Sequence, residues 1–253
     1  MAKRRRSNRR RHRGSFRFLY KVLSMLLVCA VIVVALTLFF RVNVIAVSGE
    51  QRYTEEEVRE ATQVAMGDNL FLLNKYTAAN NILSALPYVE EIRINRKLPD
   101  TLVVEVRECG DPLAIEQEGY VWLVSPAGKI VDQKTAGETE GYLLVDGCQL
   151  LAPTVGTPIA LASEYAGQQQ SLMELITALE KADMIQQATA IHLEDLSVMT
   201  MDYAGRFKVE MPYNADYPRK LRALQAVIDN LETNQTGVVQ LTWDNGEVHF
   251  IED

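Results

Sequence analysis

Apolar residues first form one long uninterrupted segment and then recur in short alternating or helical patterns. Residues 22–40 are nineteen residues without a charged side chain. At about 1.5 Å of rise per residue, a helix of this length extends roughly 28 Å, close to the hydrocarbon thickness of a bilayer. The sequence has no second run of this kind. It therefore predicts one transmembrane helix and excludes a transporter with several spans.

The pattern over residues 42–110 predicts a small β-α-α-β-β unit. A strand pattern leads from residue 42 to Gly49, and Thr54 with Glu57 then has the spacing of a helix capping box. Two helices, one ending near Ala65 and one over 76–86, precede a hairpin with its turn at 97–100. The expected buried residues are Val58, Ala61 and Ala65 in the first helix, Ala79, Leu83 and Leu86 in the second, and Ile92, Ile94, Leu102 and Val104 in the hairpin.

Residues 111–253 show many short strand patterns and two helical ones. The turn Asp244-Asn245-Gly246 between the last two strands suits a type I′ hairpin, because Asn and Gly adopt positive φ readily. The predicted fold class is therefore α+β: a single N-terminal transmembrane helix, a small β-α-α-β-β domain and a β-rich domain with two helices. Strands are expected at 113–116, 120–124, 129–131, 143–146, 157–160, 190–193, 198–202, 206–211, 237–241 and 247–251, and the two helices at 172–182 and 217–231.

Charge is distributed unevenly about the apolar segment. Residues 1–21 carry ten basic side chains and no acidic one, whereas 42–253 carry fifteen basic and thirty-three acidic side chains, within a net charge of −7. Under the positive-inside rule, this difference places the N-terminus in the cytoplasm and residues 42–253 outside the membrane. The basic arm, 1–21, has no aromatic residue before Phe16, so contact with lipid headgroups explains it better than nucleic-acid binding.

A cleaved secretory signal is the alternative to a retained anchor, since Ala46-Val47-Ser48 resembles a small-residue cleavage site. The apolar run, however, exceeds the usual upper limit of about 15 residues for the apolar part of such a signal. Ala46 also lies within the strand pattern that the following domain needs. Retention of the anchor is therefore the prediction.

Three cysteines are present, Cys29 in the predicted span and Cys109 and Cys148 in the outer domains. The outer two could pair in an oxidising compartment, but two cysteines do not form a disulfide framework. Two separate thiols are expected, with the pairing left open. The absence of a Cys-x-x-Cys motif argues against a structural zinc site or a redox motif.

Several short motifs stand out within and after the β-α-α-β-β unit. They are Gly67-Asp68-Asn69-Leu70-Phe71, Pro87-Tyr88-Val89 and, most specific, Arg96-Lys97-Leu98-Pro99-Asp100-Thr101-Leu102, followed by a hairpin over 120–128. These motifs resemble the FtsQ/DivIB family of bacterial cell-division proteins. The resemblance implies that the β-α-α-β-β unit is a POTRA domain, the polypeptide-transport-associated module. One departure is Cys109-Gly110-Asp111, which replaces a usual arginine and its neighbours at the domain junction.

The resemblance implies assembly rather than catalysis. FtsQ-like proteins recruit coiled-coil partners of the FtsB- or DivIC-like and FtsL-like kinds and regulate septal cell-wall synthesis. The expected protein is a single-pass scaffold of the cell membrane, enriched at the division septum, without a cofactor or a small-molecule substrate. The alternative is a membrane-anchored POTRA protein that acts as a chaperone or translocation factor for other chains.

An anchored cell-wall enzyme is a less favoured alternative, because the motifs it needs are missing. The sequence has no Ser-x-x-Lys, no Gly-x-Ser-x-Gly and no His-Glu-x-x-His. His192 and His249 are too few for a histidine-based zinc site, and His192 is expected to be a hydrogen-bonded structural residue. Glu194 and Asp195 are adjacent and point in different directions, which suits glycoside cleavage poorly. No catalytic, metal-binding or cofactor-binding residue is predicted.

The last predicted hairpin is the candidate partner site. A strand at a chain end often lies on a sheet edge, where its N–H and C=O groups can pair with an added strand. By family resemblance, an FtsB- or DivIC-like partner would add its strand here. Burial in the core is the alternative for Val248 and Phe250, and proline at His249 is expected to remove an outward-facing donor. The candidate residues are Val239, Leu241, Trp243, Glu247, Val248, His249, Phe250 and Ile251.

Overall fold

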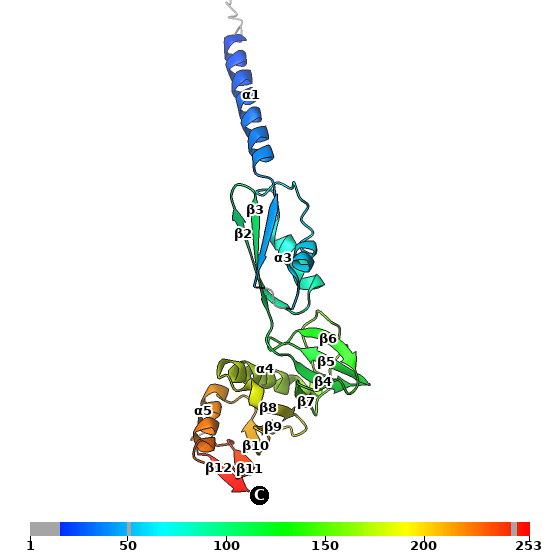
Figure 1. Ribbon diagram of the computed structural model, residues 1–253, viewed down its shortest axis with the longest axis vertical. Helices are drawn as coiled ribbons and strands as arrows, with labels where there is room; N and C mark the ends of the chain where they lie inside the picture. The colour runs from blue at the N-terminus through cyan, green and yellow to red at the C-terminus, as the bar shows by residue number, and fades with distance from the viewer. Residues whose placement is uncertain (1–15, 50–51, 244–246) are drawn as a thin grey trace, which may run out of the picture. The chain divides into compact units, whose positions relative to one another are not determined.

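The computed structural model describes residues 16–49, 52–243 and 247–253 (Figure 1). Most of the basic arm and the predicted turn at 244–246 lie outside the described residues. The chain divides into two compact units. The first unit runs to Ala46 and includes Val64–Asn74 and Asn95–Val103, and the second comprises Val47–Gln63, Lys75–Ile94 and Val104–Asp253. Because this division cuts across the strands of the first sheet, a boundary between outer domains near residue 110 stays a prediction.

The long apolar segment forms helix α1, Phe16–Phe39. Its candidate membrane span, Phe18–Phe39, is 22 residues long with Lys21 as its one charged residue, and the rest of the protein buries none of it. An apolar helix that no protein surface covers needs another apolar environment, which a bilayer provides. The helix is therefore consistent with the predicted single-pass membrane protein.

The next five elements form the predicted β-α-α-β-β unit. Thr54 precedes its first helix with the expected capping box, because its hydroxyl accepts from the Glu57 N–H and the Glu57 carboxylate accepts from the Thr54 N–H. The three strands form a sheet in the order β1-β3-β2. The elements are β1 (Val44–Ser48), α2 (Glu55–Ala61), α3 (Lys75–Ala85), β2 (Val89–Lys97) and β3 (Thr101–Glu108).

Helix α2 is shorter than predicted. It ends at Ala61 rather than near Ala65, because Gln63 adopts a positive φ of 54°, which a helix cannot continue through. Val58 and Ala61 are buried as expected, whereas Ala65 is exposed. The helical spacing of apolar residues extends to Ala65, beyond the point at Gln63 where the backbone leaves the helical conformation.

Helix α3 has a different buried stripe from the predicted one. Its buried side chains are Ala78 and Ile82, whereas Ala79 and Leu83 are half-buried. The two stripes differ by one position along the helix. The apolar pattern therefore predicted the helix correctly but not its rotation against the sheet.

The remaining strands form one nine-stranded sheet in the order β12-β11-β10-β9-β8-β7-β4-β5-β6 (Figure 1). Neighbouring strands are antiparallel except for the parallel pairs β4–β7, β7–β8 and β10–β11. The strands are β4 (Leu113–Gln117), β5 (Tyr120–Val124), β6 (Ile130–Thr135), β7 (Leu143–Asp146), β8 (Ala188–His192), β9 (Val198–Tyr203), β10 (Phe207–Pro212), β11 (Gly237–Gln240) and β12 (His249–Glu252).

Two α-helices, α4 (Ala166–Lys181) and α5 (Tyr217–Ile228), pack against each other and against this sheet. Short 3-10 turns, η1 (Ser163–Tyr165) and η2 (Ile185–Gln187), flank α4. The main core forms between these helices and the inward-facing strand residues. It includes Leu172 and Leu175 of α4, Leu221 and Leu224 of α5, and Val209 and Val239 of the sheet.

Two expectations about this part of the chain are wrong. The segment 157–160 is not a strand, since Pro158 makes only an isolated bridge to Lys129 and neighbouring Leu161 only one to Leu150. Proline lacks the N–H that a strand ladder uses, which accounts for the short pairing. Helix α4 begins at Ala166 rather than at residue 172, because Gln168 and Ser171 are also buried and extend its inner face.

Candidate functional site

Strand β12 lies at one edge of the nine-stranded sheet, and within the described part of the chain it pairs with β11 alone. The Asp253 N–H donates to the carbonyl oxygen of Thr236 at 3.2 Å. Because backbone groups alternate in direction along an antiparallel strand, the N–H groups of Ile251 and His249 also point toward β11. Those of Phe250 and Glu252 consequently point toward the open edge of the sheet.

The neighbouring strand gives the same result. The N–H groups of Gly237 and Leu241 donate to β10, to the carbonyl oxygens of Arg206 at 3.3 Å and Glu210 at 2.8 Å. Because these directions alternate along a strand, Val238 and Gln240 direct their backbone groups to β12, whereas Val239 directs its groups to β10. In the register of this pair, Gln240 lies opposite His249 and Val238 lies opposite Ile251.

This register corrects one expectation about His249. Its side chain is exposed, as predicted, but its N–H lies on the side of β11 and not on the open edge. Proline at this position would therefore remove a donor from within the sheet. The outward-facing donor with an exposed side chain is that of Glu252, a residue outside the predicted partner site.

The candidate partner residues fall into three groups by exposure: buried, half-buried and exposed. Val239 and Leu241 are buried in the core and cannot present their side chains to a partner. Phe250 is half-buried, and its ring contacts that of Phe207 edge to face at a centroid distance of 6.1 Å. Val248 is also half-buried against the core, whereas Trp243, Glu247, His249 and Ile251 are exposed.

Lys220 is a residue of this region that the sequence reasoning missed. It is 8% exposed on α5, and its Nζ donates to the carbonyl oxygen of Trp243 at 2.7 Å. The bond connects α5 to the segment that leads into the last strand. The helical spacing could have identified it, because Lys220 lies four residues before Leu224 and therefore on the inward face of the predicted helix.

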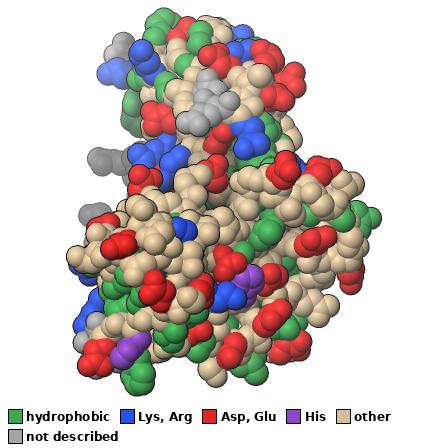
Figure 2. Space-filling view, turned by 60° about the horizontal axis from the view of Figure 1, so that its bottom comes forward, with side chains coloured by type: hydrophobic (Ala, Val, Ile, Leu, Met, Phe, Trp, Pro, Cys, Tyr) green, Lys and Arg blue, Asp and Glu red, His purple; other side chains and the backbone are tan. Residues whose placement is uncertain are grey.

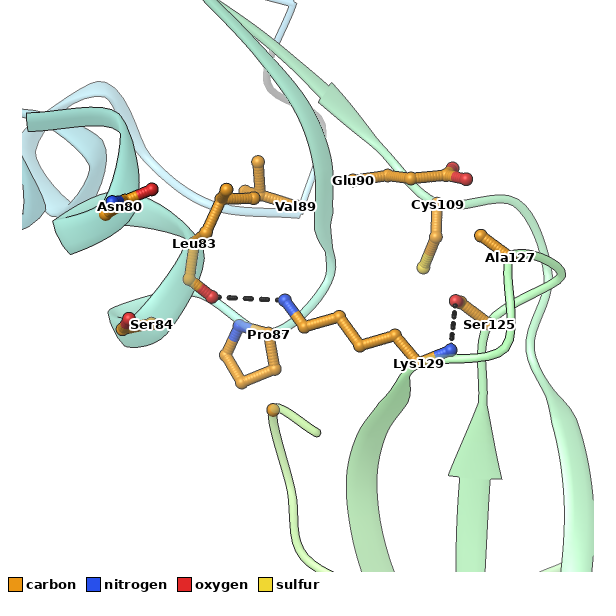
Figure 3. Close-up of a pocket in the computed structure, with 11 residues that line it drawn as sticks. Asn80, Leu83, Ser84, Pro87, Val89, Glu90, Cys109, Ser125, Ala127 and Lys129 are labelled. Carbon is orange, nitrogen blue, oxygen red and sulfur yellow. Dashed lines mark hydrogen bonds between the residues drawn. The ribbon is translucent and has the colours of Figure 1, made fainter. Parts of the chain in front are cut away.

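A pocket of about 540 Å³ in the second unit is lined by a lysine, a cysteine and a serine, the kinds of side chain that catalysis can use (Figure 3). Lys129 extends across it, and its Nζ donates to the carbonyl oxygen of Leu83, in the last turn of α3, at 3.1 Å. Burial lowers the pKa of Lys129. Cys109 also lines the pocket, and burial, together with the charge of Glu90, raises the pKa of its thiol to about 11.

These groups do not form a nucleophile with its base. The Ser125 hydroxyl accepts from the backbone N–H of Lys129 at 3.1 Å, while the Lys129 ammonium points away from it to Leu83 (Figure 3). A raised thiol pKa makes Cys109 less reactive, because the thiolate is the nucleophile. The arrangement is that of a lysine that caps the C-terminal end of a helix and interacts favourably with the negative end of the helix dipole.

His192 is hydrogen-bonded, as expected for a structural histidine. Its Nδ1 lies 2.7 Å from an oxygen of Asp146 on β7, and its Nε2 lies 3.3 Å from an oxygen of Asp202 on β9. Burial lowers the pKa of His192, but the hydrogen bonds and charges of the two carboxylates outweigh it, so the pKa is raised. Since both ring nitrogens already contact carboxylates, neither is available as a base for a substrate.

The other acidic groups are dispersed. Figure 2 shows acidic side chains scattered over the visible face among neutral ones, rather than gathered in one patch. Among the described residues, no group of three or more His, Cys, Asp or Glu side chains could hold a metal ion. Cys109 and Cys148 are both free thiols, and burial raises the pKa of Cys148 to about 11.

Comparison with known proteins gives the same result as the sequence motifs. Residues 40–108 match the family model described as POTRA domain, FtsQ-type. The chain is 22% identical to the cell division protein DivIB of Clostridium tetani over 84% of this chain and 80% of that protein. It is 26% identical to the cell division protein FtsQ of Geotalea daltonii over 79% of this chain and 71% of that protein. Identity to DivIB of Clostridium acetobutylicum is 21% over 89% of each chain. The predicted resemblance to the FtsQ/DivIB family is confirmed.

Proposed function

We propose that this chain, a relative of the FtsQ and DivIB cell division proteins, is a membrane-anchored scaffold of the bacterial division machinery. Its relatives imply a role in the divisome, because division proteins of this kind match it over most of its length. Its task in that assembly is to bind other division proteins outside the membrane and so to link them to septal cell-wall synthesis. It performs no catalysis of its own.

The observation that carries this proposal is the open edge of β12. The N–H groups of Phe250 and Glu252 point outward, and a row of such groups can pair with an extended segment of another chain. The partner proposed is a strand of an FtsB- or DivIC-like protein, with an FtsL-like protein in the same assembly. Main-chain hydrogen bonds supply affinity in this mode, and side chains beside the edge supply specificity.

Two exposed apolar side chains lie near this edge. Trp243 is 50% exposed and Ile251 is 53% exposed, and the Trp243 ring lies 5.7 Å from the ring of His249. Large side chains of this kind often dominate the binding energy of an interface. We therefore assign Trp243, His249 and Ile251 to side-chain contacts with the partner, and Phe250 to a backbone contact only.

Proline at Glu252 tests the edge directly. It removes the outward N–H, whereas the matched control Glu252→Ala keeps it; both lose the 3.4 Å contact from Gln235 Nε2. A net contribution of about 1.4 kcal/mol corresponds to a tenfold change in affinity. We expect Glu252→Pro to weaken partner binding at least about tenfold relative to Glu252→Ala, with the melting temperature nearly unchanged.

His249→Pro provides the contrast. Because it removes a donor to β11, we expect it to lower the melting temperature as well as binding. Equal binding by Glu252→Pro and Glu252→Ala would place the partner on another surface. The purified full chain and a co-expressed division partner suffice for both measurements.

The divisome role itself has a separate test. A fluorescent fusion of the full chain should concentrate at the septum of dividing cells. Uniform envelope staining would instead favour the POTRA chaperone or translocation alternative.

A further inference from the structure

Three apolar side chains remain exposed beside the end of α1. Phe71 is 54% exposed and Leu72 is 79% exposed in the loop after α2, and Leu98 is 55% exposed at the turn between β2 and β3. All three belong to the first compact unit, which also contains α1. We call these three side chains the membrane-proximal tip.

The loop of the tip is bonded to the last turn of α1. The Asn69 side-chain amide donates to the carbonyl oxygen of Thr37 at 3.2 Å, and the Leu70 N–H donates to that of Phe40 at 2.8 Å. The ring of Phe71 packs on the ring of Phe40 edge to face, with a centroid distance of 4.9 Å. The loop therefore lies at the level of residues 37–40 of the helix.

The hairpin turn is held at the same place. The N–H groups of Asn43 and Val44 donate to the carbonyl oxygen of Asp100 at 2.9 and 3.3 Å. Arg96 donates from its guanidinium to the carbonyl oxygen of Leu73 at 2.7 Å and so ties the hairpin to the loop. The position of Leu98 relative to α1 thus follows from backbone bonds on both sides of the turn.

The length of α1 places residues 37–40, and the loop bonded to them, at a membrane surface. The candidate membrane span Phe18–Phe39 is 22 residues long, or about 33 Å as a helix, against roughly 30 Å for the hydrocarbon core. Thr37 therefore lies at the boundary between acyl chains and headgroups. A loop bonded to its carbonyl oxygen lies within a few ångströms of lipid.

From this geometry we infer that the membrane-proximal tip inserts into the headgroup–acyl boundary of the leaflet in which α1 ends. The inference rests on the proposed insertion of α1 in a membrane. Aromatic and aliphatic side chains are favoured at this depth. The tip gives the first unit a second attachment to the membrane beside α1, which limits the tilt of the unit relative to the bilayer.

Charge does not select the lipid. From Arg41 to Ala46, and in the segments 64–74 and 95–103, the unit has three basic and two acidic side chains. The carboxylates of Asp68 and Asp100 accept hydrogen bonds from within the unit, from the Ala65 N–H and the Asn43 amide. The near balance of charge predicts insertion into a zwitterionic bilayer without anionic lipid.

The test uses the full chain in phosphatidylcholine vesicles whose acyl chains carry bromine near the headgroup. Leu72→Trp reports on the tip and Phe39→Trp on the end of α1; both side chains are exposed in the wild type, so the fold should be retained. The signal is the emission added to that of the two native tryptophans. The control for each variant is the same protein in unbrominated vesicles.

We expect bromine to quench the added emission of both variants at least about twofold. Quenching of Phe39→Trp but not of Leu72→Trp would overturn the tip proposal and leave the anchor intact. Absence of quenching in both would overturn the anchor as well. If Leu72→Trp is shielded from acrylamide but unquenched by bromine, protein covers the tip and the lipid proposal is wrong.

Discussion

Buried Lys220 donates from its Nζ to the carbonyl oxygen of Trp243, 2.7 Å away, and so connects α5 to the segment before the edge strand. Lys220→Met keeps the apolar stem but removes the donor. An unsatisfied buried polar group costs about 1–3 kcal/mol. We expect the free energy of unfolding to fall by about this amount, and hydrogen exchange in β12 to quicken.

The control is Lys208→Met, since Lys208 is exposed on β10. Lys208→Met should change the free energy of unfolding by no more than about 0.5 kcal/mol. Equal exchange rates in the Lys220→Met protein and the wild type would show that the bond does not hold the last strand.

Leu102→Asp tests whether the outer part of the chain consists of two domains. Leu102 is fully buried in β3, and an unpaired carboxylate there costs several kcal/mol, so the small domain should unfold. The two tryptophans, Trp122 and Trp243, both lie in the β-rich part and report on it alone. Their fluorescence transition should persist while circular dichroism shows lost structure.

The control for this variant is Val44→Asp, at a side chain that is 48% exposed in β1. It should leave both signals nearly unchanged. One simultaneous loss of fluorescence and circular dichroism in Leu102→Asp would contradict the two-domain organisation.

His192 predicts a pH dependence of stability. Its pKa is raised in the folded protein by Asp146 and Asp202, against an ordinary value of about 6.5. The folded state therefore binds the proton more tightly than the unfolded state does. This contribution is fully present below about pH 6.5 and is lost as the pH rises through the folded pKa.

Urea unfolding of the wild type between about pH 6 and pH 8 measures this effect. His192→Gln should flatten the dependence, and Asp146→Asn should reduce it, because one of the two carboxylates is then neutral. Identical slopes in wild type and His192→Gln would assign the dependence to other groups.

The charge step across α1 predicts the topology. Residues 42–253 should lie outside the membrane and stay attached to the anchor. Protease added outside intact cells stripped of their wall should digest them and spare a tag at Met1. A mature protein that starts at Gly49 would instead reveal a cleaved signal.

The sequence by itself determined the elements that depend on local pattern. The apolar run that became α1, the capping box at Thr54 and the strands β5 and β7 depend on neighbours within a few residues, and so does the motif of Arg96 to Leu102. Local spacing sets such features, because a helix or strand buries one face at a fixed period.

Only the tertiary structure decided which side of each element is used. Helix α3 is rotated so that Ile82 is buried and Leu83 only half-buried, and this rotation depends on which side of the helix the rest of the protein covers. Likewise, the direction of the His249 N–H depends on the register in which β12 pairs with β11. The placement of the loop of Phe71 and Leu72 at the end of α1 depends on the bond from Asn69 to Thr37, thirty-two positions away, which no local pattern records.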